Sequence, residues 1–464
     1  MAHPKAGTPE TERFRMTIEG RRALYSGFVI ARLKTAGLSP SKREPSLVLL
    51  REFLATLADE QVPCRWLIDS EVLARLSSGA AAKEANGDPC AQLKRVARVD
   101  LRPHPDRLAS FVSRLRLKED LVELAYAELA VTFESKFAAP SGQCMDQNYL
   151  GNAPDGIAAR KYWKETDLSR CRLVDIEGAW LLTHEDVDNG KLELLNNQMN
   201  RNCNECVNHG TSVLGVLVAK DNELGGTGVV PDIPSVGLVS TWAPDGSDDN
   251  VANAILAAMA RWGAPDYANV LLLEVQRDDP PLPTEVDLCD WQAIRCAVDH
   301  GMLVVEAAAS GDHEIAPLPS GAAKDPGMPG RRVGTRKIQL EDSGAVIVAA
   351  GRHDTVQDTS GTPVHALERG SNFGTRINCY AWGDCIYTTS ALRYEPYCDF
   401  GGTSGAAAIM AGAAALIQGV RSRRKQKFLD PETLRATLAS YGTGTLFPKQ
   451  APVGLMPDLA EILK

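Results

Sequence analysis

The stretch DFGGTSGAAAIMAGAAALIQG (residues 399–419) decides the fold. Ser404 follows two glycines and a threonine and opens a long run of small apolar residues. A helix that is apolar on every side must run through the core rather than along the surface. Ser404 is then either an ordinary N-cap of a helix over 405–419, or a nucleophile held where converging backbone N–H groups stabilise a developing oxyanion.

Short apolar runs along the preceding chain predict the sheet that surrounds this helix. Near-continuous apolar strands are typical of a parallel sheet that helices cover on both faces. Alternating strands and helices therefore predict a doubly wound, mostly parallel α/β domain over residues 149–464. The predicted strands are 171–176, 236–241, 269–275, 302–309 and 345–351, and the other predicted helices are 210–220, 249–263, 289–301 and 430–442.

The first 140 residues have a different pattern, which predicts a smaller α+β domain. Strand-like and amphipathic helical segments are mixed there without the regular alternation of the later chain. The polar stretch 135–148 carries Pro and Gly and is predicted to link the two domains. The predicted strands are 21–34 and 121–133, and the predicted helices are 43–60 and 104–117.

Composition indicates an ordinary globular protein, with 44% hydrophobic residues, 23% charged residues and a net charge of −9. Negative charge argues against nucleic acid as the main partner, because phosphate binding needs a cationic surface. No apolar stretch is predicted to span a membrane, and the first twenty residues lack the apolar core of a signal peptide. The sequence as written predicts a cytoplasmic protein, or a secreted one if a leader was removed.

Eleven cysteines are spread along the chain. In a reducing compartment most are expected to be free, buried thiols. Cys203 and Cys206 form a CNEC pair, but no second pair stands at metal-ligand spacing, so no zinc site is predicted. Cys206 is expected to be a buried bystander.

Three polar residues beside apolar elements could carry chemistry. Asp175 ends an apolar strand, His209 heads an apolar helix and Ser404 opens another. Taken singly, each is better explained as a cap, an ion-pair partner or a satisfied core residue. In the order Asp, His, Ser on a parallel α/β sheet, they fit one mechanism. His209 would take the Ser404 hydroxyl proton, while Asp175 holds the imidazole tautomer and its charge.

The sequence around these residues resembles the bacterial type of subtilisin-like serine peptidases (subtilases). NHGTSVLGVLVA (208–219) is similar to the family's His block, FGGTSGAAAIMAGAAAL (400–416) to its Ser block and CRLVDIEGAW (171–180) to its Asp block. Three blocks in the right order are specific, and the resemblance extends over about residues 148–464. It implies a subtilisin-like fold and a serine endopeptidase with Asp175, His209 and Ser404 as its catalytic triad.

Two positions depart from the family pattern. Ala408 replaces a proline of the Ser block, with a mild structural effect because Ala is a good helix former. Ser310 stands at the oxyanion-hole asparagine, and loss of that donor in another subtilase lowers kcat by about 10²–10³. The alternatives are that the alignment slips toward Asp312 and His313, or that the protein is a pseudopeptidase that binds peptides without turnover.

The resemblance also assigns a role to the N-terminal region. VSRLRLKEDLVELAYAELAV (112–131) is similar to the last helix, turn and strand of the family's prodomain, whose final strand lies in the substrate cleft. It implies that residues 1–140 are a folding aid and inhibitor that the enzyme removes by cutting within 135–148. A permanent adaptor domain that recruits a partner is the alternative.

The resemblance implies that polypeptide substrates add as a strand along 272–276 and 305–310. Glu274 and Glu306 could bias the cleft toward basic side chains, beside Ala307 and Ala308, or could equally form structural ion pairs. Calcium is implied by the resemblance only, because no acidic loop shows recognisable ligand spacing. No cofactor is expected to be required and no metal site is predicted.

Overall fold

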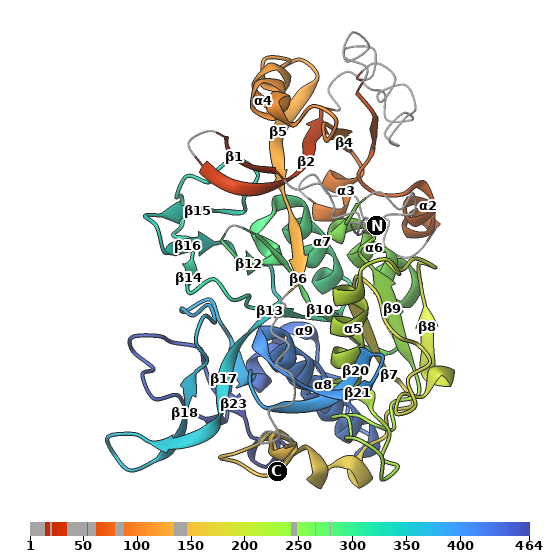
Figure 1. Ribbon diagram of the computed structural model, residues 1–464, viewed down its shortest axis with the longest axis vertical. Helices are drawn as coiled ribbons and strands as arrows, with labels where there is room; N and C mark the ends of the chain where they lie inside the picture. Colours follow the sequence, from red (N-terminus) through yellow and green to blue (C-terminus); the bar gives the residue numbers. More distant parts are fainter. Residues whose placement is uncertain are drawn as a thin grey trace, which may run out of the picture.

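An eight-stranded sheet forms the centre of the computed structural model (Figure 1). Its strands are β7 (Cys171–Glu177), β8 (Leu192–Leu194), β9 (Val236–Ser240), β10 (Ala268–Leu273), β13 (Met302–Ala307), β17 (Val346–Gln357), β18 (Pro363–Leu367) and β19 (Cys379–Trp382). Their order is β18-β17-β13-β10-β7-β9-β8, with β19 also paired to β17. All these pairs are parallel except β17 with β18. The structure describes residues 14–18, 21–34, 53, 62–78, 88–133, 146–242, 248–264, 266–278 and 280–464.

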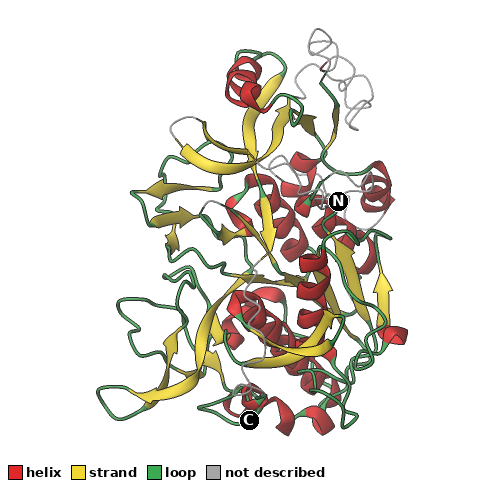
Figure 2. Ribbon diagram, viewed as in Figure 1, coloured by secondary structure: helices red, strands yellow, loops and turns green. Residues whose placement is uncertain are grey.

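Helices cover both faces of this sheet (Figure 2). On one face α5 (Asn204–Val218) packs beside α8 (Gly402–Arg423), and on the other α6 (Val251–Trp262) packs beside α7 (Leu288–Asp299). α9 (Pro431–Leu438) follows its N-cap Asp430 and lies against β13. The predicted doubly wound, mostly parallel sheet is therefore confirmed, and its five predicted strands correspond to β7, β9, β10, β13 and β17.

The central helix α8 is buried along its length from Gly402 to Val420. By length and composition it could cross a membrane, so the expectation that no stretch qualifies is wrong on that criterion. Its apolar window is entirely enclosed by the rest of the protein, which accounts for the composition. The alanines and glycines of this helix let β7, β10, β13, β17 and β19 pack closely around it.

The N-terminal part is a smaller unit built on an antiparallel sheet, as predicted for an α+β domain (Figure 1). The sheet has the order β1-β2-β4-β3, and β2 also pairs antiparallel with β5. The predicted helix at 43–60 lies outside the described residues, apart from Phe53. The elements are β1 (Phe14–Ile18), β2 (Arg21–Leu33), β3 (Cys64–Trp66), α2 (Ser70–Ser78), α3 (Pro89–Leu93), β4 (Val96–Asp100), α4 (Leu108–Arg116) and β5 (Val122–Leu129).

A short strand continues from this unit into the larger one. After Ala130 the chain forms β6 (Val131–Phe133), which pairs antiparallel with β11 (Val275–Arg277). Phe133 lies opposite Val275, and β12 (Leu282–Pro283) pairs with the other side of β11. The predicted domain boundary and linker fall after Phe133, largely outside the described residues.

Smaller sheets complete the larger unit. The predicted loop 317–332 contributes to one of them, because its last residues begin β15, which pairs with β16. A hairpin of β20 and β21 packs against α5. The remaining elements are β14 (Glu314–Pro317), β15 (Gly330–Val333), β16 (Lys337–Leu340), β20 (Ile386–Leu392), β21 (Glu395–Phe400), β22 (Gly442–Thr443), β23 (Met456–Pro457) and α10 (Leu459–Ile462).

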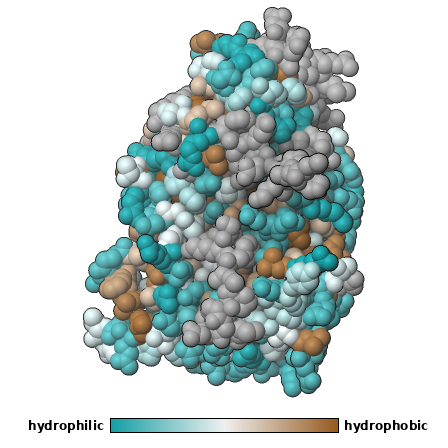
Figure 3. Space-filling model, in the orientation of Figure 1, coloured by the Kyte–Doolittle hydropathy of each residue, from teal (hydrophilic) through white to brown (hydrophobic). Residues whose placement is uncertain are grey.

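The face seen in Figure 3 is mostly hydrophilic, with apolar residues in small separate groups. The apolar residues of the chain are largely used in the core around the central sheet. The N-terminal helices α2 and α3 pack against α6 and α7.

Candidate active site

His209 lies between a hydroxyl and a carboxylate. Its Nε2 is 3.0 Å from Ser404 Oγ, and its Nδ1 is 2.6 Å from Glu177 Oε1. The imidazole is fully buried, at 0% exposure. His209 belongs to the second turn of α5, which begins at Asn204, so the prediction that it heads the helix is wrong.

Ser404 is the third residue of α8, whose N-cap is Gly401. The interpretation of Ser404 as an N-cap is therefore wrong. The turn into the helix needs glycine, because Gly402 has φ +72° and a Cβ on Gly401 would lie 2.3 Å from the carbonyl oxygen of Gly383. This turn places Ser404 in the first helical turn, where backbone N–H groups have no partner within the helix.

The carboxylate on His209 belongs to Glu177, so the prediction that Asp175 holds the imidazole is wrong. Residues i and i+2 of a strand face the same side, and Glu177 is nearer the carboxyl end of β7. Asp175 lies deeper, where its Oδ2 accepts a hydrogen bond of 2.8 Å from Trp180 Nε1. Burial, with the Glu177 charge adding, raises the pKa of Asp175 well above its ordinary value. The Asp175 side chain is thus directed to Trp180, and Glu177 is the carboxylate that lies beside His209.

The sequence contained a signal for Glu177. It is the last residue of an apolar strand and precedes Gly178, which is where a strand-end functional group of an α/β sheet is expected. Asp175, two residues earlier, attracted the prediction because it matched the residue type of the Asp block. Position relative to the end of the strand was the better guide.

A disulfide lies at the N-terminus of the helix that carries His209. Cys203 and Cys206 are bonded, with their Cα atoms 5.2 Å apart. Cys206 contacts the loop after β7, because a Cβ on Gly178 would lie 2.8 Å from Cys206 Cβ. The expectation that Cys206 is a bystander thiol is therefore wrong, and so is the expectation of free thiols for this pair.

Strand β6 brings an aromatic side chain to His209. The ring centroids of Phe133 and His209 are 6.1 Å apart at 60°, and Phe400 lies 5.5 Å away on another side at 77°. A Cβ on Gly178 would be 2.9 Å from Phe133 Cζ, so the ring also lies over Gly178. The predicted edge 272–276 overlaps β11, and that strand does accept an added strand.

The loop that carries Ser310 is shaped by a buried asparagine that the sequence analysis missed. Ser310 is half-buried after β13, and Ala309 turns the chain with φ +64°. Asn372 satisfies all of its hydrogen-bonding capacity within this region, as a buried amide must. Its Oδ1 accepts from Gly311 N (3.2 Å) and His313 N (2.8 Å), and its Nδ2 donates to the carbonyls of Ala308 (2.7 Å) and Pro281 (3.0 Å).

The residues of the slipped alignment point elsewhere. His313 Nε2 lies 3.1 Å from the carbonyl oxygen of Thr335, and Asp312 forms an ion pair with Arg336. Both side chains are used within the loop and the neighbouring segment, and the oxyanion role of Ser310 stays a prediction.

Glu306 does not face a substrate cleft, so that prediction is wrong. Its side chain is 0% exposed, and Oε1 accepts 2.8 Å from the backbone N–H of Glu285. Burial and the nearby Glu285 raise the pKa of Glu306 well above its ordinary value. Glu274 is also buried, between β10 and β11, and Ala307 and Ala308 are buried at the end of β13. Substrate contacts of these last three residues stay a prediction.

Asp186 is the best candidate for holding a cation. Its side chain is buried, and neither carboxylate oxygen makes a hydrogen bond of good geometry among the described residues. Asn222 and the Gly226 amide face the carboxylate, and burial raises the pKa of Asp186 to about 6. A buried carboxylate suits a hard cation such as calcium, which prefers oxygen ligands.

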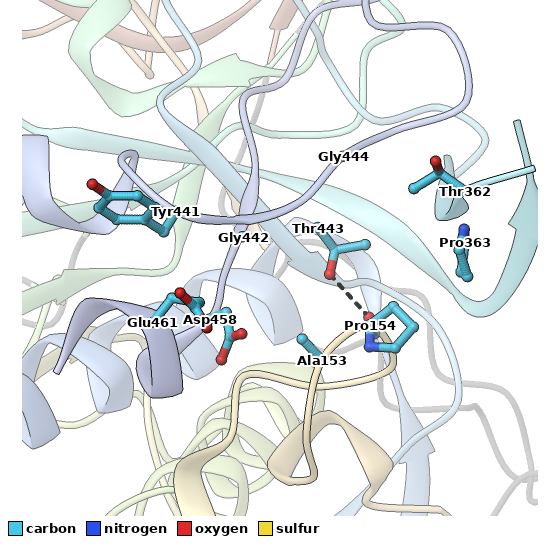
Figure 4. Close-up of a pocket in the computed structure, with 10 residues that line it drawn as sticks. All are labelled: Ala153, Pro154, Thr362, Pro363, Tyr441, Gly442, Thr443, Gly444, Asp458 and Glu461. Carbon is cyan, nitrogen blue, oxygen red and sulfur yellow. Dashed lines mark hydrogen bonds between the residues drawn. The ribbon is translucent and has the colours of Figure 1, made fainter. Parts of the chain in front are cut away.

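A cavity of about 450 Å³ lies away from these residues (Figure 4). Thr443 Oγ1 donates to the carbonyl oxygen of Pro154 (3.3 Å) at its wall. None of the side chains around His209 lines it. The lining residues are Ala153, Pro154, Thr362, Pro363, Tyr441, Gly442, Thr443, Gly444, Asp458 and Glu461.

The family model of the subtilases matches residues 183–443, which are 261 of the 464 residues. The chain belongs to the subtilase family. As a subtilase it is a serine protease, and polypeptides are its substrates. The match includes His209 and Ser404 but begins after Glu177. Glu177 therefore lies outside the segment that the family model matches.

Solved structures with a similar fold are also subtilisin-like proteases. Fervidolysin from Fervidobacterium pennivorans, a keratinolytic enzyme related to subtilisin, aligns with 14% identity and a TM-score of 0.56 over 98% of this subtilase and 66% of that chain. The prenylagaramide maturation protease PagA aligns with 20% identity and a TM-score of 0.45. The alignment covers 66% of this subtilase and 97% of that chain. A protease from Pseudoalteromonas arctica PAMC 21717 aligns with 17% identity and a TM-score of 0.46. The alignment covers 70% of this subtilase and 98% of that chain. No curated protein matches the sequence.

Proposed function

We propose that this subtilase is an endopeptidase with a Glu177–His209–Ser404 triad. The observation that carries the proposal is the position of His209, within hydrogen-bonding distance of both Ser404 and Glu177. A nucleophile, a base and a group that orients the base in one chain of contacts are the geometry of acyl transfer.

In this mechanism Ser404 Oγ attacks the substrate carbonyl while His209 Nε2 takes its proton. Glu177 accepts the Nδ1–H hydrogen bond, which fixes the reactive tautomer and stabilises the imidazolium. The oxyanion forms at the N-terminus of α8, with Ser310 as the candidate side-chain donor. His209 then protonates the leaving amine, and water releases the acyl group by the same steps in reverse order.

The N-terminal unit is proposed to be an inhibitor that the enzyme removes. Strand β6 adds to β11 as a substrate strand would, and Phe133 lies against the His209 ring. The chain beyond Phe133 enters the predicted cleavage region 135–148. Self-cleavage there would leave β6 as the product strand in the cleft until the unit departs.

Fluorophosphonate labelling with intact-mass measurement tests both parts of the proposal, with Ser404→Ala as the matched variant. We expect wild type to show a cut C-terminal to Phe133 and an adduct on Ser404, and the variant to show neither. Cleavage or labelling in the variant would remove Ser404 from the mechanism.

The second candidate function is a pseudopeptidase that binds peptides without turnover, and Ser310 is the observation that favours it. If wild type is neither cut nor labelled, labelling of Ser310→Asn tests whether the serine at position 310 is the cause of the inactivity. Restored labelling would support the pseudopeptidase. No change with a stable Ser310→Asn protein would show that Ser310 is not the defect.

We also infer that calcium stabilises the fold at Asp186. The cation would supply charge balance for the buried carboxylate and would take no part in peptide hydrolysis. Calcium should raise the Tm of wild type, and Asp186→Asn should remove that rise. An equal calcium response in both proteins would place the cation elsewhere.

A further inference from the structure

The N-terminal unit shares a cluster of buried apolar side chains with α6 and α7, and it also meets these helices through polar contacts. Arg98 pairs with Asp248, and its Nη2 donates to the carbonyl oxygen of Asp249 at 2.9 Å. Contacts of this kind at an interface are exchangeable with water once the unit moves away. The others include Asn250 Nδ2 to Leu67 O (2.6 Å), Asn253 Nδ2 to Asp69 Oδ2 (2.7 Å) and Tyr126 OH to Asp287 Oδ1 (3.1 Å).

One contact between the two units is covalent. Cys90 on α3 forms a disulfide with Cys296 on α7, with Cα atoms 5.5 Å apart and 206 residues between them in sequence. Figure 1 shows α3 beside α7, and the two helices are in contact. Asp88 caps α3 through Cys90 N (2.9 Å), and Gln92 Oε1 accepts a hydrogen bond from Gln292 Nε2. Two further contacts thus hold the disulfide in register.

The position of this bond relative to β6 has a topological consequence. Cys90 precedes Phe133 in the chain and Cys296 follows it. A single cut after Phe133 therefore divides the polypeptide into two chains that Cys90–Cys296 still joins.

We propose that the Cys90–Cys296 disulfide retains the N-terminal unit on the peptidase after self-cleavage, and that thiol–disulfide exchange releases it. The proposal rests on the self-cleavage proposed above. While the bond is intact, β6 returns to β11 as an intramolecular ligand. A short tether gives an effective concentration of about millimolar, which a dilute substrate does not reach. Cutting alone then leaves the cleft filled, and reduction is the activating step.

The chemistry balances with a dithiol protein as partner. Its thiolate attacks Cys90 Sγ, which is the accessible sulfur because Cys90 is half-buried and Cys296 is 1% exposed. The S–S bond breaks, Cys296 leaves as a thiolate that takes a proton, and a mixed disulfide forms on Cys90. The second thiol of the dithiol then displaces Cys90 as a thiol, and the dithiol ends as a disulfide. Formation runs in reverse, with an oxidised dithiol protein as the disulfide donor.

Cys64 provides a matched control on the same unit. It lies on β3, is free, and burial raises the pKa of its thiol to about 12, which makes it a poor nucleophile for exchange. Cys64→Ser removes one sulfur from the N-terminal unit, as Cys90→Ser does, without touching the bond to α7.

The bond itself is tested on Ser404→Ala protein, which does not depend on cleavage. The protein is alkylated without reductant, digested and analysed by mass spectrometry. We expect a peptide pair joined through Cys90 and Cys296, lighter by two hydrogens than the separate thiol peptides. Alkylation of both cysteines would overturn the proposal, including the case in which a metal ion held by Cys90, Cys296 and nearby His300 replaces the disulfide.

Retention is tested on wild type by denaturing gels with and without reductant. Wild type and Cys64→Ser should run at full mass without reductant and as two fragments with it, whereas Cys90→Ser should give two fragments in both lanes. Fragments that separate without reductant in wild type would overturn retention alone. A wild type that stays uncut in both lanes would refute self-cleavage, and with it the release step, while the linked peptide of the previous experiment stands.

Release is tested by peptide hydrolysis before and after dithiothreitol. The rate of wild type should rise at least about tenfold on reduction, and Cys90→Ser should already be active and respond little. Because reduction also opens Cys203–Cys206 near His209 and the disulfide of Cys385, an equal response in Cys90→Ser would assign the effect to those bonds and overturn the proposal.

Discussion

The activity of Glu177→Gln, compared with that of Asp175→Asn, tests which of the two acids on β7 orients His209. An amide at position 177 has no charge for the imidazolium, and its NH₂ group can turn His209 to the tautomer that cannot accept the Ser404 proton. Glu177 Oε1 and His209 Nδ1 are 2.6 Å apart and fully buried. With an effective dielectric constant of about 20, unit charges at about 3–4 Å interact by about 4–6 kcal/mol. We therefore expect kcat/KM to fall by about 10³–10⁴-fold.

Asp175→Asn is the matched comparison. Asp175 accepts a hydrogen bond from Trp180, and an asparagine keeps that accepting oxygen, so the loss should stay below about tenfold. The assay is hydrolysis of a fluorogenic peptide by protein matured under identical conditions, with circular dichroism and Tm as folding controls. A large loss in folded Asp175→Asn and a small one in Glu177→Gln would refute the assignment of the acid.

Three further changes test the surroundings of the site. Gly178→Ala places a Cβ 2.9 Å from Phe133 Cζ and 2.8 Å from Cys206 Cβ, so urea unfolding should show a loss of about 1–3 kcal/mol, and unchanged stability would mean that this contact is loose. Asn372→Ala leaves two backbone N–H groups without their acceptor and should cost about 1–3 kcal/mol and lower kcat, whereas loss of stability alone would separate the loop from catalysis. Burial raises the pKa of Asp399 from 3.8 to about 6, with Asp384 adding and His353 opposing. Because the folded state favours the protonated form, Tm should fall as the pH rises from 3.8 to about 6 relative to Asp399→Asn, and equal pH profiles would contradict this.

The sequence predicted the parts of the fold that depend on burial. The strands around β7 are continuous apolar runs because helices cover both faces of the sheet. The residues of α8 are small and apolar because strands of the sheet and α5 pack closely against this helix. Elements such as β3 and α3 escaped notice because they are short and carry charges or turn residues. The position of β3 is set by its pairing with β4, and that of α3 by its contact with α7, which is distant in sequence.

In the candidate site, too, local sequence identifies some residues, and contacts between distant segments place the others. His209 and Ser404 were found because their neighbouring glycines and small residues are required by local geometry. The acid was misassigned because Asp175 and Glu177 differ only in their distance from the end of one strand. Asn372 and the bond between Cys90 and Cys296 depend on pairings between segments far apart in the chain, which no local pattern records.

The packing of α8 on one face of the central sheet bears on the stage of folding at which the enzyme can first cut proteins. Ser404 and His209 are 195 residues apart, and α8 can be seated only after the parallel strands around it have paired. Pairings of such high contact order form late. In a growing or partly folded chain, Ser404 and His209 are therefore not yet in contact, and the chain cannot cut other unfolded chains. Peptidase activity begins only when the core is complete.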